Sequence, residues 1–344
     1  MAELGAEVGF LRFAGSRVAF AVSGDGPPVV SPAWWVSHLD LDWRDDAFRA
    51  FFASVAAGRT LVRYDRPGTG LSDRDVDLTA WTLDDDVALL RAVMDEMGLE
   101  RASVLGASSG GCAAIAFAAR HPERVERLVL YGAYGDGASI APPAVQQALA
   151  AAVRAHWGLG SRALADVFVG TQDGDARRRW IRDQQASAQP EAAAALLELV
   201  YRMDVRPWLE QVRVPTVVVH RRGDRAIPHA CGRELAGSIP GARLVSLDGD
   251  AHLPWIGDST SASRALGSFL TGARAVDPAA AALLSRRERE VLVLVADGLS
   301  DREIAERITV SHHTVHRHVA NIRRKLGSGS RAAAVAEAVR LGLL

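Results

Sequence analysis

Short apolar segments alternate with alanine-rich helical segments between residues 29 and 219. Four of the apolar segments, rich in valine and leucine, are residues 60–64, 102–106, 127–131 and 216–220. Strands that are buried on both faces of a sheet have this continuous apolar character. Because helical stretches separate them, the pattern predicts a mostly parallel, doubly wound sheet with helices packed on each side, an α/β fold.

The strand pattern stops between residues 134 and 207. This stretch is alanine-rich and helical in character, with interspersed aromatic residues such as Trp157 and Phe168. We interpret it as a helical cap inserted into the α/β domain, under which Trp157 and Phe168 line a ligand pocket. The alternative for each aromatic side chain is an ordinary place in the packing between helices.

Residues 273–282 are mostly small and include a proline, a composition typical of an interdomain linker. The sequence therefore predicts two domains, residues 1–272 and 283–344. Two helices of the second domain begin with a capping box, in which a serine side chain accepts from the amide three residues on and a glutamate reaches back. These boxes are Ser285 with Glu288 and Ser300 with Glu303.

A third helix of this domain begins after Ser311, its expected N-cap, and ends at Gly327. Its apolar positions form one narrow stripe, Val315, Val319, Ile322 and Leu326. The opposite face carries His313, His316, Arg317, Ala320, Arg323 and Arg324. A short helix followed by a longer one with a basic outward face is the geometry that inserts a recognition helix into the DNA major groove. A fourth helix, residues 330–341, is suited to pairing with a second copy.

The distribution of charge agrees with a nucleic-acid partner for this domain. Residues 284–344 hold eleven basic and seven acidic residues, a net charge of +4, so the rest of the chain carries −5 of the total of −1. The tail is therefore the part suited to a polyanion.

Residues 284–344 resemble a LuxR-type helix-turn-helix domain along their whole length. The matching pieces are residues 284–292, 298–305, 310–311, 314–319, 321–322 and 325–327. The resemblance implies a transcriptional regulator that binds double-stranded DNA as a homodimer. The chain departs from the family at His316, where lysine is usual, and at Ala320, which is often polar or basic. The alternative is a helical domain that only pairs proteins.

Within this resemblance we expect His316 and Arg317 to approach base edges. His313 and Ala320 lie on the same outward face. The expected phosphate contacts are Ser311, Thr314, Arg323 and Lys325.

Residues 106–110, Gly-Ala-Ser-Ser-Gly, separate a predicted strand from a predicted helix and place Ser108 in a tight turn. The flanking glycines leave the serine oxygen unobstructed. A serine becomes nucleophilic beside a base and an orienting acid, and Asp224 and His252 each follow a later predicted strand. The turn alone could arise by chance, and we interpret Asp248 and Asp250 as solvated loop residues.

Residues 29–270 resemble the α/β-hydrolase fold, with further support from residues 64–72, Tyr-Asp-Arg-Pro-Gly-Thr-Gly-Leu-Ser. The resemblance implies Ser108 as nucleophile, His252 as base and Asp224 as orienting acid, and the bonds cleaved as ester or lactone bonds.

An oxyanion hole needs backbone amides, which we expect from Ser109 and Trp34. Where the family usually has His-Gly after the strand at residue 31, this chain has Pro32-Ala33-Trp34, and Pro32 cannot donate. Trp34 and Trp35 narrow the expected pocket, which also includes Trp255. Slow turnover, or none, is the expectation.

Composition excludes several other classes of protein. With 49% hydrophobic and 24% charged residues the chain is ordinary for a globular protein, and no apolar run approaches the ~18 residues that span a bilayer. The N-terminal residues are acidic where an export signal is basic, so the cytoplasm is the expected location.

Cys112 and Cys231 are too few for a disulfide framework or zinc cluster. Because Lys325 is the only lysine, neither a receiver domain nor a nucleotide-binding Gly-x-x-x-x-Gly-Lys loop is present. We expect no metal and no cofactor.

Three functions remain. The first is a regulator whose hydrolase-like domain binds, and slowly hydrolyses, a small apolar ligand that controls DNA binding. The second is a working esterase or lactonase with an accessory DNA-binding tail. The third is a hydrolase-like scaffold for oligomerisation. We favour the first, because an enzyme has little physical reason to carry a groove-reading helix.

Overall fold

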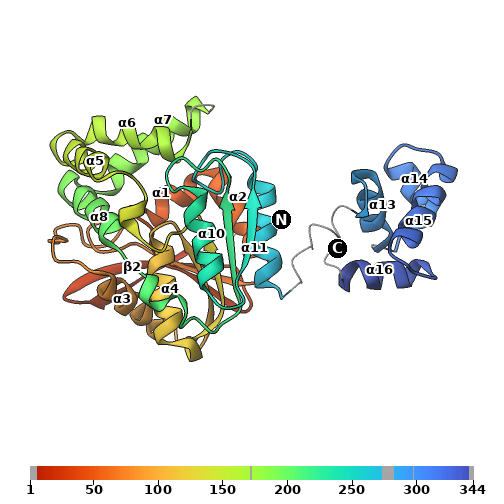
Figure 1. Cartoon of the computed structure of the whole chain (residues 1–344), viewed down its shortest axis with the longest axis horizontal. Helices are drawn as coiled ribbons and strands as arrows, with labels where there is room; N and C mark the ends of the chain where they lie inside the picture. The colour runs from red at the N-terminus through yellow and green to blue at the C-terminus, as the bar shows by residue number, and fades with distance from the viewer. Residues whose placement is uncertain (1–5, 171–172, 273–282, 297, 341–344) are drawn as a thin grey trace. The chain divides into compact units, whose positions relative to one another are not determined.

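The computed structural model describes residues 6–170, 173–272, 283–296 and 298–340. The chain divides into two compact units, Met1–Gly267 and Ser268–Leu344 (Figure 1). Each unit has its own apolar core. The expected linker, residues 273–282, lies outside the described residues.

The first unit is built on an eight-stranded sheet, in the order β1-β2-β4-β3-β5-β6-β7-β8. From β4 to β8 along this order each neighbouring pair is parallel, whereas β1 and β2 are antiparallel additions at one edge. The strands are β1 Glu7–Phe13, β2 Ser16–Ser23, β3 Pro28–Ser31, β4 Thr60–Tyr64, β5 Ala102–Ala107, β6 Val125–Tyr131, β7 Thr216–Arg221 and β8 Arg243–Leu247. The predicted α/β fold is confirmed.

The hairpin of β1 and β2 was not expected from the sequence. Phe10 in β1 is 45% exposed while its neighbour Leu11 is buried, so burial alternates along this edge strand. Apolar residues lie on both of its faces, because Val8 and Phe10 are on the exposed one.

Helices cover both faces of the sheet (Figure 1). Gly267 lies close to the backbone of Val55, and the helices Leu83–Glu96 (α3) and Gly110–Arg120 (α4) pack against each other. The helices outside the cap are α1 Leu39–Arg44, α2 Asp46–Val55, α3 Leu83–Glu96, α4 Gly110–Arg120, α10 His229–Ser238 and α11 Ser259–Leu270. Two short 3-10 helices are Pro122–Arg124, before β6, and Gly137–Ser139, in the segment between β6 and β7.

A helical cap occupies the chain between β6 and β7. It consists of α5 Pro143–Ala155, α6 Trp157–Phe168, α7 Gly174–Ser187, α8 Pro190–Arg202 and α9 Arg206–Leu209. Helices α5, α6 and α7 gather at one end of the unit (Figure 1). The predicted insertion is therefore confirmed.

The second unit contains four described helices, α13 Arg286–Ala296, α14 Asp301–Arg307, α15 His312–Lys325 and α16 Arg331–Arg340. Both predicted capping boxes are formed, and Ser311 caps α15 by accepting from the Thr314 amide. Val315 and Ile322 are buried with Val291 and Ile304. The predicted four-helix domain is confirmed.

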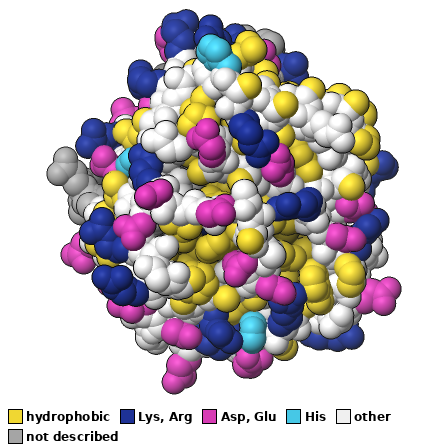
Figure 2. Space-filling model, turned by 90° about the vertical axis from the view of Figure 1, so that its left-hand side faces the viewer, with side chains coloured by type: hydrophobic (Ala, Val, Ile, Leu, Met, Phe, Trp, Pro, Cys, Tyr) yellow, Lys and Arg dark blue, Asp and Glu magenta, His cyan; other side chains and the backbone are white. Residues whose placement is uncertain are grey.

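Acidic and basic side chains are interspersed over the face of the molecule in Figure 2, around a hollow where apolar side chains gather. Neither sign of charge dominates this face. No helix among the described residues is long and apolar enough to cross a membrane. Cys112 and Cys231 are both buried and free.

Candidate functional site

Ser108 lies at the sharp turn between β5 and α4. Its backbone φ of 53° is in the left-handed region, which a residue other than glycine adopts at a cost of about 1–3 kcal/mol. Two glycines permit the turn: a Cβ on Gly106 would lie 2.7 Å from Cβ of Ala114, and a Cβ on Gly110 would lie 2.8 Å from the carbonyl oxygen of Pro32. The turn therefore exposes the side chain of Ser108 at the end of β5.

His252 and Asp224 are joined by a hydrogen bond of 2.8 Å from Nδ1 to Oδ2. Asp224 follows β7 and His252 follows β8, so the carboxyl ends of adjacent parallel strands bring them together. Both side chains are buried. With Nδ1 bound to the acid, Nε2 of His252 is the nitrogen left to face another group.

The charge of the Asp224 carboxylate is stabilised despite its burial. Burial alone would raise its pKa, but the attraction of His252 and hydrogen bonds from His220 and His252 outweigh burial and leave the pKa well below the usual value. The amides of Ala226 and Ile227 also donate to Oδ1 at 3.0 Å. The acid is therefore an anion throughout the physiological pH range.

Arg66 fixes the loop that follows β3. Its guanidinium donates to both oxygens of Asp86, at 2.7 and 2.8 Å, and to the carbonyls of Ala33, Trp34 and Trp35 at 3.0–3.3 Å. The C=O and N–H of one trans peptide point in opposite directions. The bond to the Ala33 carbonyl therefore turns the Trp34 amide away from Arg66.

The amides expected to form an oxyanion hole, those of Ser109 and Trp34, have no hydrogen-bond acceptor among the described residues. Ser109 begins α4, where backbone N–H groups lack partners within the helix. Both amides are therefore unengaged, as an oxyanion hole requires of its donors.

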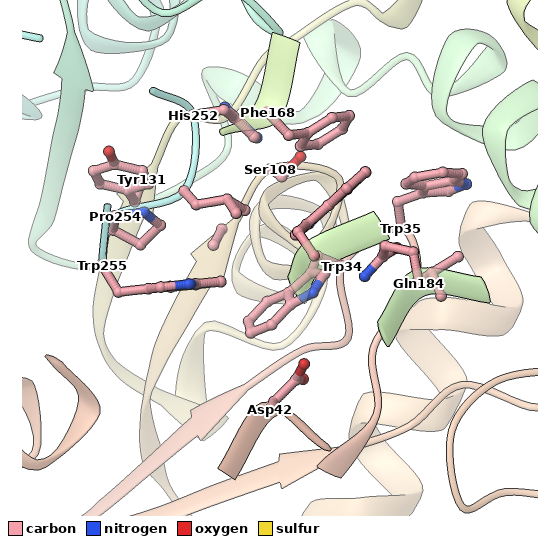
Figure 3. A pocket seen from close by; sticks show the side chains of 14 residues that line it. Trp34, Trp35, Asp42, Ser108, Tyr131, Phe168, Gln184, His252, Pro254 and Trp255 are labelled. Carbon is pink, nitrogen blue, oxygen red and sulfur yellow. The ribbon is translucent and has the colours of Figure 1, made fainter. Parts of the chain in front are cut away.

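Ser108 and His252 line one pocket of about 540 Å³ (Figure 3). Of the expected pocket residues, Trp34, Trp35, Phe168 and Trp255 also line it. Trp157 does not. It packs edge-on against Trp35, with ring centroids 5.9 Å apart, and its Nε1 donates to the carbonyl of Ala188.

The cap closes the pocket through Phe168. The Phe168 carbonyl accepts from the His252 amide at 2.9 Å, and its ring meets the His252 ring edge-on at 5.2 Å. The Phe168 ring also stacks on Trp35 and Trp180, at 5.8 and 5.3 Å. The cap and the histidine loop are thus held together by a continuous aromatic layer.

Further pocket residues were not identified from the sequence. Asp42 in α1 and Gln184 in α7 line the same pocket as Ser108, together with Tyr131 and Trp180. The motif Tyr64-Asp65-Arg66 supported the fold in the sequence analysis, but it did not predict that Arg66 binds the carbonyls of residues 33–35. Asp42 and Gln184 gave no signal, because each lies in a polar helical stretch with no motif around it.

The outward face of α15 exposes His313, His316, Arg317 and Ala320, and Thr314 is half-buried. Nδ1 of His316 lies 3.3 Å from Oδ2 of Asp301. No ion pair of Arg317 occurs among the described residues, which leaves its guanidinium free for an external partner.

The residues expected to hold phosphates already have partners within the domain. The hydroxyls of Ser311 and Thr314 bond to each other at 2.8 Å. Arg323 donates to the carbonyl of Gly329, and Nζ of Lys325 lies 2.7 Å from Oε2 of Glu288.

Two families match the chain. Residues 36–258 match the family described as alpha/beta hydrolase fold, and residues 282–338 match the bacterial regulatory proteins of the luxR family.

The relatives of the first unit are hydrolases. The pimeloyl-[acyl-carrier protein] methyl ester esterase of Aromatoleum aromaticum is 32% identical over 54% of this chain and 77% of its own length. The 2-hydroxymuconate semialdehyde hydrolase of Pseudomonas sp. is 29% identical over 74% of this chain and 87% of its own. Among solved structures, the enol-lactonase of Burkholderia xenovorans has a TM-score of 0.64 at 26% identity, covering 76% of this chain and all 100% of that one.

Proposed function

The chain belongs to the α/β-hydrolase fold family and ends in a LuxR-family DNA-binding domain, and from this premise we propose that it is a ligand-controlled transcriptional regulator. In this proposal the hydrolase unit binds a small, largely apolar molecule in the pocket beside Ser108. Occupancy of the pocket changes the affinity of the helix-turn-helix domain for double-stranded DNA.

The observation that carries the proposal is the aromatic lining of that pocket. Rings of Trp34, Trp35, Phe168 and Trp255 surround a small volume beside Ser108. Pockets that bind small molecules are mostly apolar, with a few placed polar groups. A ligand that fills this space contacts the cap through Phe168 and the histidine loop through Trp255.

The chemistry at Ser108 sets the class of ligand. His252 accepts the serine proton, Asp224 orients His252 and stabilises its cation, and the serine oxygen attacks a carbonyl carbon. The carbonyl oxygen becomes an anion facing the amides of Ser109 and Trp34. Collapse expels the alcohol, protonated by His252, and water then releases the acid. The named activities of the relatives, an esterase and an enol-lactonase, favour an ester or lactone as the ligand class.

Regulation requires that the ligand bind the DNA-competent and incompetent states with different free energies. Coupling of this kind typically changes affinity by roughly 5–150-fold. Slow cleavage suits a sensor, because the signal persists until the ligand is hydrolysed.

A fluorophosphonate label at Ser108 tests the proposal on the full chain. The labelled and unlabelled protein are titrated with fragmented genomic DNA at several salt concentrations, with Ser108→Ala carried through the same treatment as the control. We expect labelling to change DNA affinity at least 5-fold in the wild-type chain and to leave Ser108→Ala unchanged. Identical affinities before and after stoichiometric labelling would refute regulation through this pocket.

A second candidate is an active serine hydrolase whose DNA-binding tail is accessory. The 2.8 Å bond between His252 and Asp224 and the left-handed turn at Ser108 favour it. This candidate is supported if the wild-type chain hydrolyses an ester and its affinity for DNA does not change when the substrate is added. If Ser108→Ala abolishes turnover yet still responds to ligand, the pocket acts as a receptor. If turnover and response vanish together, cleavage is part of the signal.

A further inference from the structure

A second histidine lies beside the acid of the candidate catalytic residues. His220 belongs to β7, is completely buried, and takes no part in the chemistry described for Ser108. Its Nε2 lies 3.5 Å from Oδ2 of Asp224, the oxygen that also binds His252. The same Nε2 lies 2.9 Å from the carbonyl oxygen of Ile227. One ring nitrogen therefore faces both the acid and the loop that carries the acid.

These contacts decide which ring nitrogen of His220 carries the proton. A carbonyl oxygen and an ionised carboxylate both accept hydrogen bonds and donate none, so Nε2 must be the donor. Nδ1 is buried and has no hydrogen-bond partner among the described residues, so no acceptor is present for a proton on that nitrogen. The ring therefore carries its proton on Nε2, and this N–H faces the Ile227 carbonyl and the Asp224 carboxylate together.

The other side of the His220 ring packs against α10. A Cβ on Gly232 of that helix would lie 2.5 Å from Nδ1, so the ring fits beside the helix because residue 232 has no side chain. The ring of His229 meets the ring of His220 edge-on, with centroids 5.7 Å apart, and Nε2 of His229 lies 2.8 Å from Oγ of Ser246. The packing therefore holds the His220 ring in one orientation.

The loop that carries Asp224 is bound at both of its ends. At its start, two backbone amides donate to carbonyls of the loop that follows β8, at 3.0 and 3.3 Å. At its other end, the Ile227 carbonyl accepts from His220, and the Ile227 amide donates to Oδ1 of Asp224 at 3.0 Å. Ile227 thus links a side chain of the central sheet to the carboxylate.

We propose that His220 is a positioning residue, which holds the carboxylate of Asp224 where that carboxylate orients His252. It acts through Nε2, which donates to the Ile227 carbonyl and faces Oδ2 of the acid, and it keeps its proton throughout. This inference rests on the chemistry proposed for Ser108. Its size follows from geometry, because a displacement of about 1 Å in a reacting site can lower reactivity roughly 100-fold.

The first measurement needs no reaction. Histidine that is isotope-labelled at its ring nitrogens is incorporated into the full chain, and NMR reports which of these nitrogens carry protons. The signals that disappear in His220→Gln are those of His220. We expect a protonated Nε2 and an unprotonated Nδ1, and an unprotonated Nε2 overturns the inference. Because this measurement uses the wild-type chain, the inference can be overturned even if a variant of His220 does not fold.

The second measurement is the rate at which fluorophosphonate labels Ser108. His220→Leu removes the donor, whereas His220→Gln keeps an N–H near the place of Nε2. We expect the leucine variant to react roughly 10–100-fold more slowly than the wild type, and the glutamine variant to recover most of this loss. Val218→Ala is the matched control, because Val218 is buried in the same strand and lies two residues away on the same face of the sheet. It removes packing without removing a donor, so it should react at the wild-type rate.

The proton that His252 shares with Asp224 provides a spectroscopic signature of the same positioning. Its NMR resonance reports the 2.8 Å bond between the two side chains. We expect this resonance to move in His220→Leu, to return in His220→Gln and to stay in place in Val218→Ala. A side chain that only stabilised the fold would leave the resonance where it is, because the folded molecules would retain the bond.

A wild-type labelling rate and an unmoved resonance in His220→Leu overturn the inference. Equal losses in the leucine and glutamine variants also overturn it, because they would assign the effect to the shape of the ring and not to its donor. Failure of the proposed function has a different signature: the wild-type chain does not react at Ser108, or its labelling leaves DNA affinity unchanged. In that case the resonance of the shared proton still decides whether His220 holds the acid.

Discussion

Nζ of Lys325 lies 2.7 Å from Oε2 of Glu288, an ion pair that joins the last turn of α15 to the first turn of α13. The Glu288 side chain is only 5% exposed and also accepts from the Ser285 amide as part of the capping box. The single lysine of the chain therefore has a structural partner inside the domain, although the family resemblance assigned it to DNA phosphates.

Lys325→Met should therefore lower stability more than it changes DNA binding. Removing the ammonium leaves the Glu288 carboxylate buried with one donor fewer, at a cost of about 1–3 kcal/mol. Urea unfolding measures this cost, and the slope of log affinity against log salt measures phosphate contacts. A slope reduced by about 0.9 with unchanged stability would instead assign Lys325 to a phosphate.

Arg317→Ala should have the opposite profile. The Arg317 side chain is exposed on α15, so its removal should leave the unfolding free energy within about 0.5 kcal/mol. We expect it to weaken binding to a specific duplex by about 1–3 kcal/mol if the guanidinium reads a base. Exposed Arg302, paired with Glu306 on α14, supplies a control variant, Arg302→Ala. Wild-type affinity across all salt concentrations would show that another face of α15 meets DNA.

Asp224→Asn should abolish most reactivity of Ser108 and leave the fold intact. The amide keeps the shape of the carboxylate but no longer stabilises the His252 cation, and the labelling rate with fluorophosphonate should fall about 10⁴-fold. Asp248→Asn, at an exposed acid of the neighbouring loop, should react as the wild type does. Comparable labelling of the two variants would assign the orienting role to another group.

Arg66→Leu should be among the most destabilising single substitutions. It leaves Asp86 as an unpaired buried charge and frees three carbonyls of the loop at residues 33–35, which predicts a loss of about 3–5 kcal/mol. Arg44→Leu breaks an exposed pair with Asp40 and should cost less than about 1 kcal/mol. Urea unfolding of both variants gives the comparison, and equal losses would contradict the role of Arg66 as an anchor.

Asp42→Asn should stabilise the chain in alkaline solution. Burial raises the pKa of Asp42 from 3.8 to about 7. The Arg63 guanidinium and the His38 amide oppose this rise, whereas the nearby carboxylates of Asp65 and Asp183 add to it. Because the folded state holds the proton more tightly than the unfolded state, this contribution to stability is complete below about pH 4 and is lost as the pH rises through about 7.

The asparagine variant escapes that loss, so its advantage over the wild type should grow between about pH 4 and pH 8, to at most about 4 kcal/mol. Unfolding free energies at a series of pH values measure the trend. A constant difference across the range would mean that Asp42 titrates as an ordinary carboxyl.

Local sequence patterns were sufficient for much of this architecture. The inner strands, the two capping boxes and the turn at Ser108 depend on residues only a few positions apart, and each appears where the pattern predicted it. Asp224 and His252 could be predicted because carboxyl ends of parallel strands meet at one edge of a sheet. The β1–β2 hairpin was not predicted, because its strands are antiparallel to the neighbouring sheet and lie outside the alternation of strands and helices that marked the inner strands.

The places of Asp42 and Gln184 in the pocket lining were decided by tertiary structure alone. The two residues come from helices far apart in the chain and line one pocket only because the cap packs over the sheet. Trp157 faces a neighbouring tryptophan instead of the pocket, and Lys325 pairs with Glu288, for the same reason. The sequence by itself determined which elements form and which serine stands at the turn, because local hydrogen bonding and burial act over a few residues. Which side chains converge on a ligand depends on long-range packing, which no local pattern encodes.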